Sequence, residues 1–238
     1  MLKPLLLQIE VAGDTATAAA EAVNEASGER TISVIELLTD GSTLWIIIPL
    51  VLLSIVGIYI FIERFLAIKK AQKEDPNFIN QIKDHIHEGK LDAAKSLCAQ
   101  TQNPVAKMIE KGVLRIGKPL GDISAAIENV GKLEIYKLEK SLATLATIAG
   151  AAPMIGFLGT VLGMILTFHE INAGGQAVKI EELSGGIMQA LVTTVAGLVI
   201  GIIAYIAYNM LVARVEKVVH LMESRTIEFM DILQEPTK

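Results

Sequence analysis

The stretch that decides the fold is SLATLATIAGAAPMIGFLGTVLGMILTF, residues 141–168, which contains no charged side chain. Two further uncharged stretches lie before and after it, at Gly41–Ile62 and Leu183–Ala213. A bilayer core of about 30 Å is crossed by a helix of about 20 apolar residues, so each stretch can span a membrane. At about 1.5 Å per residue, helices over the last two stretches exceed the hydrocarbon thickness. We therefore expect an all-α polytopic membrane protein with three transmembrane helices, the second and third extending into a cytoplasmic helical bundle.

The basic residues predict the orientation of these helices. Of 21 Lys and Arg residues, 14 lie between Arg64 and Lys140, and four lie at or after Arg214. Because segments rich in Lys and Arg stay on the cytoplasmic side, the N-terminus and the loop at residues 170–182 are expected outside, and the C-terminus inside. The first ten residues resemble a weak signal peptide or, alternatively, a segment lying on the membrane surface.

These boundaries divide the chain into seven segments. The first is an external N-terminal segment with an interfacial amphipathic helix (residues 1–40), followed by a first transmembrane helix (41–66) and a cytoplasmic helical region (67–140). A second transmembrane helix (141–169), a short external loop (170–182), a third transmembrane helix (183–213) and a cytoplasmic C-terminal helix (214–238) complete the chain. Start signals predict short cytoplasmic helices from Asp75, Asp92 and Asn103. A longer helix is expected to run without a break from Asp122 into the second span, and the third span to continue to about Pro236.

Small residues recur along one side of the second and third spans. Membrane helices gain little by moving apolar side chains from lipid onto one another, so small faces that allow close approach favour their association. The residues that we expect to serve helix packing are Gly156, Gly159, Gly163, Ala190, Gly197 and Gly201.

Polar but uncharged side chains also lie at membrane depth. A Thr hydroxyl can bond back to its own helix, whereas an amide in hydrocarbon needs partners from elsewhere. The alternative to such local bonds is a pore in an oligomer, and the candidate pore-lining residues are Thr160, Thr194, Gln189, Thr193 and Thr147. None of them titrates near neutral pH, so any proton carried past them must be accepted by a carboxylate or His supplied by other residues.

Other function classes find no support in the sequence. The net charge of −5 argues against nucleic acid as a partner. Cys98 is the single cysteine and reads as a core residue of a small helix. His85 and His87 point apart on a helix, which predicts solvated surface and no metal site, and His169 reads as an interfacial cap or a residue of a pore mouth. We find no nucleophile–base set or paired carboxylates, so we expect no enzyme and no cofactor.

Two motifs then identify a family. APMIGFLGTVLGM, residues 152–164, and GIMQALVTTVAGL, residues 186–198, closely resemble the second-span and third-span motifs of the MotA/TolQ/ExbB proton-channel family, with the ExbB members nearest. The resemblance implies a pentamer in the bacterial inner membrane with a periplasmic N-terminus. Its second and third spans would line a pore around a dimer of ExbD- or TolR-like single-span subunits, each with one membrane aspartate. Thr160 and Thr194 fall on the family's pore threonines, and Gln189 stands where many members carry glutamate.

The resemblance also implies a function. An ExbB-like subunit would convert proton motive force into work for TonB-dependent transport across the outer membrane, with a TonB-like protein and membrane lipid as further partners. A TolQ-like motor for envelope integrity is the near alternative, and MotA-like members are disfavoured because they generally have four spans. A non-conducting structural scaffold in the membrane is the alternative from a different class.

Overall fold

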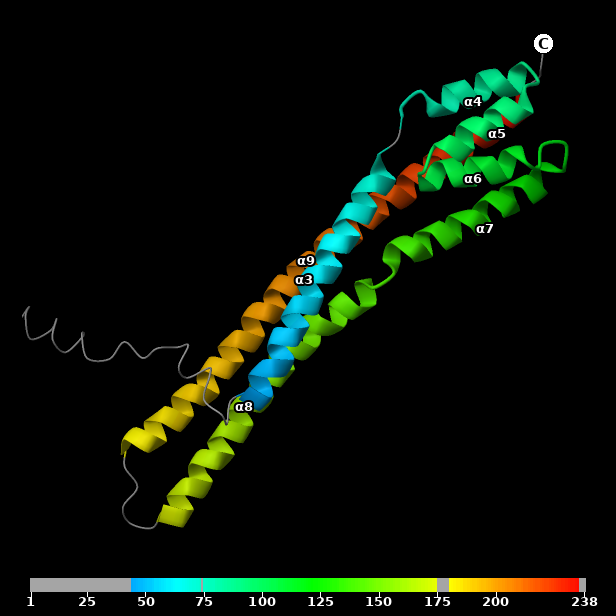
Figure 1. The fold of residues 1–238 in the computed structure, drawn as a ribbon. Helices are drawn as coiled ribbons and strands as arrows, with labels where there is room; N and C mark the ends of the chain where they lie inside the picture. Colours follow the sequence, from blue (N-terminus) through cyan, green and yellow to red (C-terminus); the bar gives the residue numbers. More distant parts are fainter. Residues whose placement is uncertain (1–43, 74, 175–179, 236–238) are drawn as a thin grey trace, which may run out of the picture.

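The protein is an extended bundle of helices (Figure 1). The computed structural model describes residues 44–73, 75–174 and 180–235, and within these ranges it contains helices and no strand. The helices are α3 (Leu44–Gln72), α4 (Phe78–His87), α5 (Leu91–Gln100), α6 (Pro104–Val113), α7 (Leu120–Glu139), α8 (Leu142–Gly174) and α9 (Ile180–Gln234). The expected all-α fold is confirmed. The N-terminal segment with its expected amphipathic helix lies outside the described residues, as do residues 175–179 of the expected external loop.

Three apolar segments, in α3, α8 and α9, are long and apolar enough to cross a membrane. This confirms the three spans expected from the sequence. At about 1.5 Å per residue, the 55 residues of α9 form a rod of about 80 Å, more than twice the thickness of a bilayer core. α9 therefore has a membrane-depth half, which packs on α8 and α3, and a second half that extends beyond it.

The smaller helices α4, α6 and α7 pack against that second half of α9, and α5 packs on α4 and α6 (Figure 1). Their shared core is apolar, and its largest fully buried side chains include Phe78, Ile79, Ile82, Ile109, Ile127, Met222 and Phe229. Burial of apolar side chains of this size contributes roughly 1.5–3 kcal/mol each. The bundle is thus held together by the hydrophobic effect in water, whereas α3, α8 and α9 expose large apolar side chains at membrane depth.

Local sequence signals explain where the short helices begin and end. The Asn103 side chain accepts a hydrogen bond of 2.6 Å from the Ala106 amide, which caps the start of α6. Gly89 follows α4 with φ +71°, and Gly117 lies between α6 and α7 with φ +94°, a left-handed conformation that favours glycine. The three short helices predicted from their start signals are confirmed.

One prediction about continuity is wrong. The helix expected to run unbroken from Asp122 into the second span is interrupted, because α7 ends at Glu139 and α8 begins at Leu142. Lys140 is extended, with ψ 134°, and Ser141 has φ +69°. A left-handed conformation costs a residue with a Cβ about 1–2 kcal/mol, so tertiary contacts must hold this turn. The turn diverts α7 from the axis of α8.

Polar contacts near the end of α7 are among the tertiary contacts that stabilise this turn. Arg64 of α3 is only 8% exposed, and its guanidinium Nη1 donates a hydrogen bond of 2.9 Å to the Lys137 carbonyl. The Glu134 carboxylate is buried and accepts hydrogen bonds from Lys107 (2.9 Å) and Lys137 (2.6 Å). Burial alone raises the pKa of Glu134, but the two ammonium groups together outweigh it and lower that pKa. α7 is therefore fastened to both α3 and α6.

Candidate functional site

The central feature at membrane depth is the close approach of α8 and α9. Gly156 and Gly197 face each other where the two backbones meet. A Cβ atom added to Gly197 would lie 2.5 Å from the Ala152 carbonyl oxygen and 2.9 Å from the Gly156 Cα. Both neighbours are backbone atoms, which cannot rotate away. Only glycine therefore fits at this point of the contact.

The other small residues continue this contact along both helices. A Cβ on Gly163 would come within 2.8 Å of the Ala190 Cβ, Gly159 lies against the Thr193 side chain, and Gly201 lies against the Pro153 ring. The structure thus places all six residues with expected packing roles on the α8–α9 contact.

The candidate pore threonines make different hydrogen bonds. Thr194 of α9 donates across the contact to the Gly156 carbonyl of α8, at 2.8 Å. Thr160 donates within its own helix to the Phe157 carbonyl, at 2.7 Å, and the exposed Thr147 donates to the carbonyl four residues before it, at 2.9 Å. Thr160 and Thr194 are both half-buried, which leaves part of each side chain open to a neighbouring molecule.

Thr193 and Gln189 occupy the side of α9 near these threonines. Thr193 is only 2% exposed, its side chain fills the space beside Gly159, and its hydroxyl donates to the Ala190 carbonyl at 2.7 Å. This position differs from the pore-lining one that we expected, because the contact between α8 and α9 encloses the side chain. Gln189 is half-buried, one turn before Thr193. Of the five candidates, Thr160, Thr194, Gln189 and Thr147 retain some exposure.

Beside the α8–α9 contact lies an open apolar groove of about 730 Å³. Thr194 lies in its lining together with Pro153, Met154, Phe157 and Leu198. The Met154 and Phe157 side chains are largely exposed in the single chain. At membrane depth such a surface contacts lipid or another helix. The membrane-depth parts of α8 and α9, residues 142–168 and 184–213, contain no Asp, Glu, Lys, Arg or His.

The structure also places the residues outside the membrane region that the sequence singled out. Cys98 is buried in α5, and burial raises the pKa of its thiol to about 12, so the thiol is unreactive. His85 is half-buried and His87 is exposed beside Glu235, 3.7 Å from its carboxylate. His169 is exposed near the end of α8. The described residues contain no cluster of three or more His, Cys, Asp or Glu side chains suited to a metal ion.

Sequence reasoning missed one polar member of the α8–α9 contact. Thr167 is buried, donates to the Gly163 carbonyl at 2.8 Å, and fills the space beside Gly186 of α9. Its spacing of four residues from Gly163 places it on the small face of α8 and is the signal that could have found it. The contact therefore extends further towards the α8–α9 loop than the motif glycines indicate.

Comparison with known proteins gives this geometry its context. Residues 100–224 match the MotA/TolQ/ExbB proton channel family. The chain belongs to this family. The match includes α6, α7, the membrane-depth part of α8 and most of α9, so the buried α8–α9 contact and the α7–α8 turn both lie within it.

Relatives with names of both the ExbB and TolQ kinds are similar to the chain. A biopolymer transport protein ExbB homologue of Methanothermobacter thermautotrophicus is 31% identical over 177 residues, covering 72% of this chain and 62% of the relative. The biopolymer transport protein ExbB of Aquifex aeolicus is 42% identical over 96 residues, which cover 40% of this chain and 64% of the relative. The Tol-Pal system protein TolQ of Pseudomonas aeruginosa is 29% identical over 218 residues, which cover 82% of this chain and 94% of the relative. The chain is thus a membrane protein of a proton-channel family, and the first of these alignments spans less than two thirds of the relative.

Proposed function

We propose that the chain is an ExbB-like subunit of an inner-membrane motor that uses proton motive force to drive TonB-dependent transport across the outer membrane. Five copies form a ring, with the N-terminus in the periplasm and the C-terminus in the cytoplasm. α8 and α9 face the centre of the ring, where Thr160, Thr194, Gln189 and Thr147 line the pore. Family membership and the uncharged, hydroxyl-bearing α8–α9 pair support this assignment.

The absence of ionisable groups at membrane depth decides what the partner must supply. Hydroxyls and an amide orient water but do not release protons near neutral pH, so a titrating carboxylate has to come from another chain. We assign that role to an ExbD- or TolR-like single-span subunit with one membrane aspartate. The open groove that contains Thr194 offers an apolar surface beside a hydroxyl, which suits contact with such a helix.

The energy available to this arrangement is sufficient for mechanical work. One charge that crosses 100 mV releases about 2.3 kcal/mol, and a pH gradient adds to it. Because the glycines of α8 and α9 are buried against each other, each α8–α9 pair is a rigid wall. We propose that a few protons per step turn the partner helices against this wall.

The test is a double substitution, Thr160→Val with Thr194→Val, in the chain reconstituted with its single-span partner. Valine keeps the shape of threonine and removes the hydroxyl, so we expect the oligomer to persist and voltage-driven proton flux into liposomes to be lost. A matched Thr160→Ser and Thr194→Ser variant keeps both hydroxyls and should retain flux. Undiminished flux through the valine variant would overturn the pore assignment and favour a non-conducting scaffold.

A TolQ-like role in envelope integrity is the second candidate. The TolQ alignment supports it, because it covers 82% of this chain and 94% of that relative. Complementation separates the two roles. An ExbB-like chain restores TonB-dependent uptake to a strain that lacks its own subunit, whereas a TolQ-like chain restores detergent resistance to a strain that lacks TolQ.

A further inference from the structure

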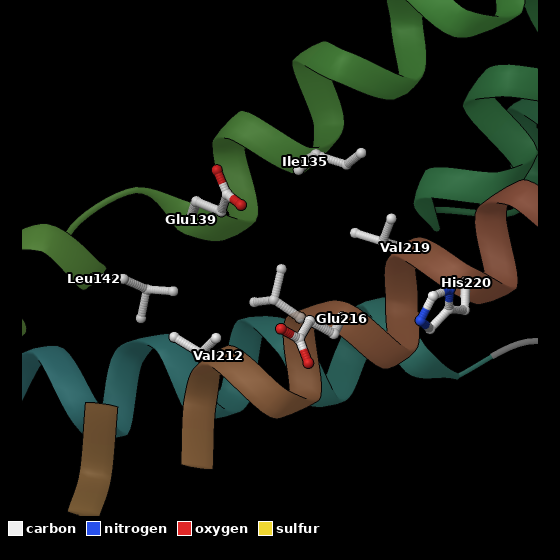
Figure 2. Close-up of a pocket in the computed structure, with 8 residues that line it drawn as sticks. Ile135, Glu139, Leu142, Val212, Glu216, Val219 and His220 are labelled. Atoms are coloured by element: carbon white, nitrogen blue, oxygen red, sulfur yellow. The ribbon is translucent and has the colours of Figure 1, made fainter. Parts of the chain in front are cut away.

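A second groove, of about 310 Å³, lies between α7 and α9 next to the turn that joins α7 to α8 (Figure 2). Its walls are mostly apolar and include Ile135, Leu142 and Val219. His220 of α9 also lines it, and its Nδ1 lies 3.4 Å from the Glu223 carboxylate. Glu139 stands on the α7 side and Glu216 on the α9 side, so a carboxylate lies at each edge of the opening. We call this feature the acidic groove. Its lining contains none of the candidate pore residues.

The acidic groove exists because of the strained turn. Ser141, with φ +69°, sends α7 away from the line of α8, and the side chains of α7 and α9 leave the resulting space unfilled. A strained non-glycine residue persists only where surrounding contacts hold it, and such residues cluster at functional positions. The strain and the unfilled space therefore point to an occupant that the single chain lacks.

The two carboxylates are unpaired within the described part of the chain. Their neighbours are paired: Glu134 binds two lysines, and Glu128 binds Lys132 at 2.7 Å. Glu139 and Glu216 make no ion pair with any described residue. A groove with apolar walls and a carboxylate at each edge suits an aliphatic cation, because the walls cover the carbon chain and the carboxylates bind the charge. A lysine side chain has this chemistry. Anionic lipid headgroups are repelled by the two carboxylates.

The chain itself carries two lysines at the same level along the bundle as the two carboxylates of the acidic groove. Lys140 follows Glu139, and Lys217 follows Glu216; both lysines are exposed and make no ion pair with a described residue. Successive residues on a helix point about 100° apart, so Lys217 lies on the face of α9 next to the one that carries Glu216. In a cyclic ring each copy presents two different faces to its two neighbours, at equal height along the axis.

We propose that Lys140 and Lys217 of one copy bind the acidic groove of the next copy, with their ammonium groups against Glu139 and Glu216. This inference rests on the ring of the proposed function and assigns to it a specific contact just outside the membrane. In this contact the lysines of the neighbouring copy fill the open side of the groove.

Charge exchange in the full-length chain, purified in mild detergent, tests the contact. Glu139→Lys with Glu216→Lys, and separately Lys140→Glu with Lys217→Glu, should each cause loss of the oligomer in size-exclusion chromatography with light scattering. All four substitutions in one chain restore opposite charges between copies and should restore the oligomer. Glu128→Lys, on the same helix as Glu139, is the matched control and should leave the oligomer unchanged.

Disulfide trapping keeps the proposal testable if a reversed-charge variant fails to fold. Two differently tagged chains, both with Cys98→Ala, are co-expressed, one with Glu216→Cys and the other with Lys140→Cys. Oxidation should join the two tags, whereas Glu128→Cys in place of Glu216→Cys should not give this product. Only a contact between copies produces the mixed species.

Two results would overturn the proposal. One is an oligomer that survives either pair of charge reversals, and the other is the absence of the mixed disulfide in chains that do assemble. If the four-substitution chain stays monomeric while Glu139→Lys with Glu216→Lys abolishes binding of the single-span partner, the groove takes its cation from that partner. Failure of the proposed function is distinct, because it shows as undiminished proton flux through the Thr160→Val, Thr194→Val variant and leaves the trapping result unchanged.

Discussion

Replacement of Gly197 by alanine tests the physical reading of the α8–α9 contact most directly. The new Cβ would lie 2.5 Å from the Ala152 carbonyl oxygen, whereas ordinary van der Waals contact begins near 3.4 Å. The close neighbours belong to the backbone of α8, so the two helices must separate locally by about 1 Å. A gap of this size forfeits a quarter to a half of the dispersion energy of each affected atom pair.

The magnitude follows from three contributions. Overpacking a tight contact costs about 1–3 kcal/mol. The hydrogen bond from Thr194 to Gly156, now 2.8 Å, would stretch beyond hydrogen-bonding distance, which costs about 1 kcal/mol more. The higher helix propensity of alanine returns about 1 kcal/mol. We expect a net loss of about 1–3 kcal/mol in the free energy of unfolding.

The assay is denaturant unfolding in mixed micelles, followed by circular dichroism. Gly185→Ala is the matched control, because it lies on the same helix and an added Cβ there meets no atom within 4 Å. Gly185→Ala should therefore be neutral or stabilising by up to about 1 kcal/mol. If Gly197→Ala proves as stable as the wild type, the backbones do not approach as closely as described, and the packing argument fails.

Two further predictions concern the α7 end of the bundle. Ser141→Gly should stabilise the chain by about 1 kcal/mol in the same assay, because glycine adopts φ +69° without strain. Ser141→Ala keeps a Cβ and should not stabilise the chain. Equal effects of the two substitutions would show that the turn at Ser141 is not strained. Glu134→Gln should cost about 1–2 kcal/mol at pH 7. Since the folded-state pKa of Glu134 is lowered, its contribution is complete above its ordinary pKa of 4.5 and is lost as the pH falls through the folded value. The wild type and Glu134→Gln should therefore converge in acid, and a difference that does not depend on pH would contradict the assignment.

Much of this architecture follows from local sequence. Uninterrupted apolar stretches predicted the three long helices, and start signals such as Asn103 predicted the short ones. The motifs of the second and third spans indicated the family, which the comparison with known proteins confirms. These features depend on residues that are close in the chain, and so they can be read from one sequence.

The turn at Ser141 could not be predicted in this way. No glycine or proline marks it, and the surrounding residues favour a helix. The contacts that hold it come from far along the chain, since Arg64 of α3 binds the Lys137 carbonyl and Lys107 of α6 binds Glu134. The buried position of Thr193 likewise depends on Gly159 of a different helix.

The sequence by itself determined that the chain has three segments able to cross a membrane, and that the second and third carry small residues and hydroxyls and contain no carboxylate. Hydropathy, length and the chemistry of single side chains suffice for those conclusions. Only the tertiary structure decided which hydroxyl bonds across helices, as Thr194 does, and which is enclosed, as Thr193 is. It also decided where α7 departs from α8 and opens the acidic groove. These outcomes depend on how two helices approach each other, a balance of backbone contacts and strain that no single segment encodes.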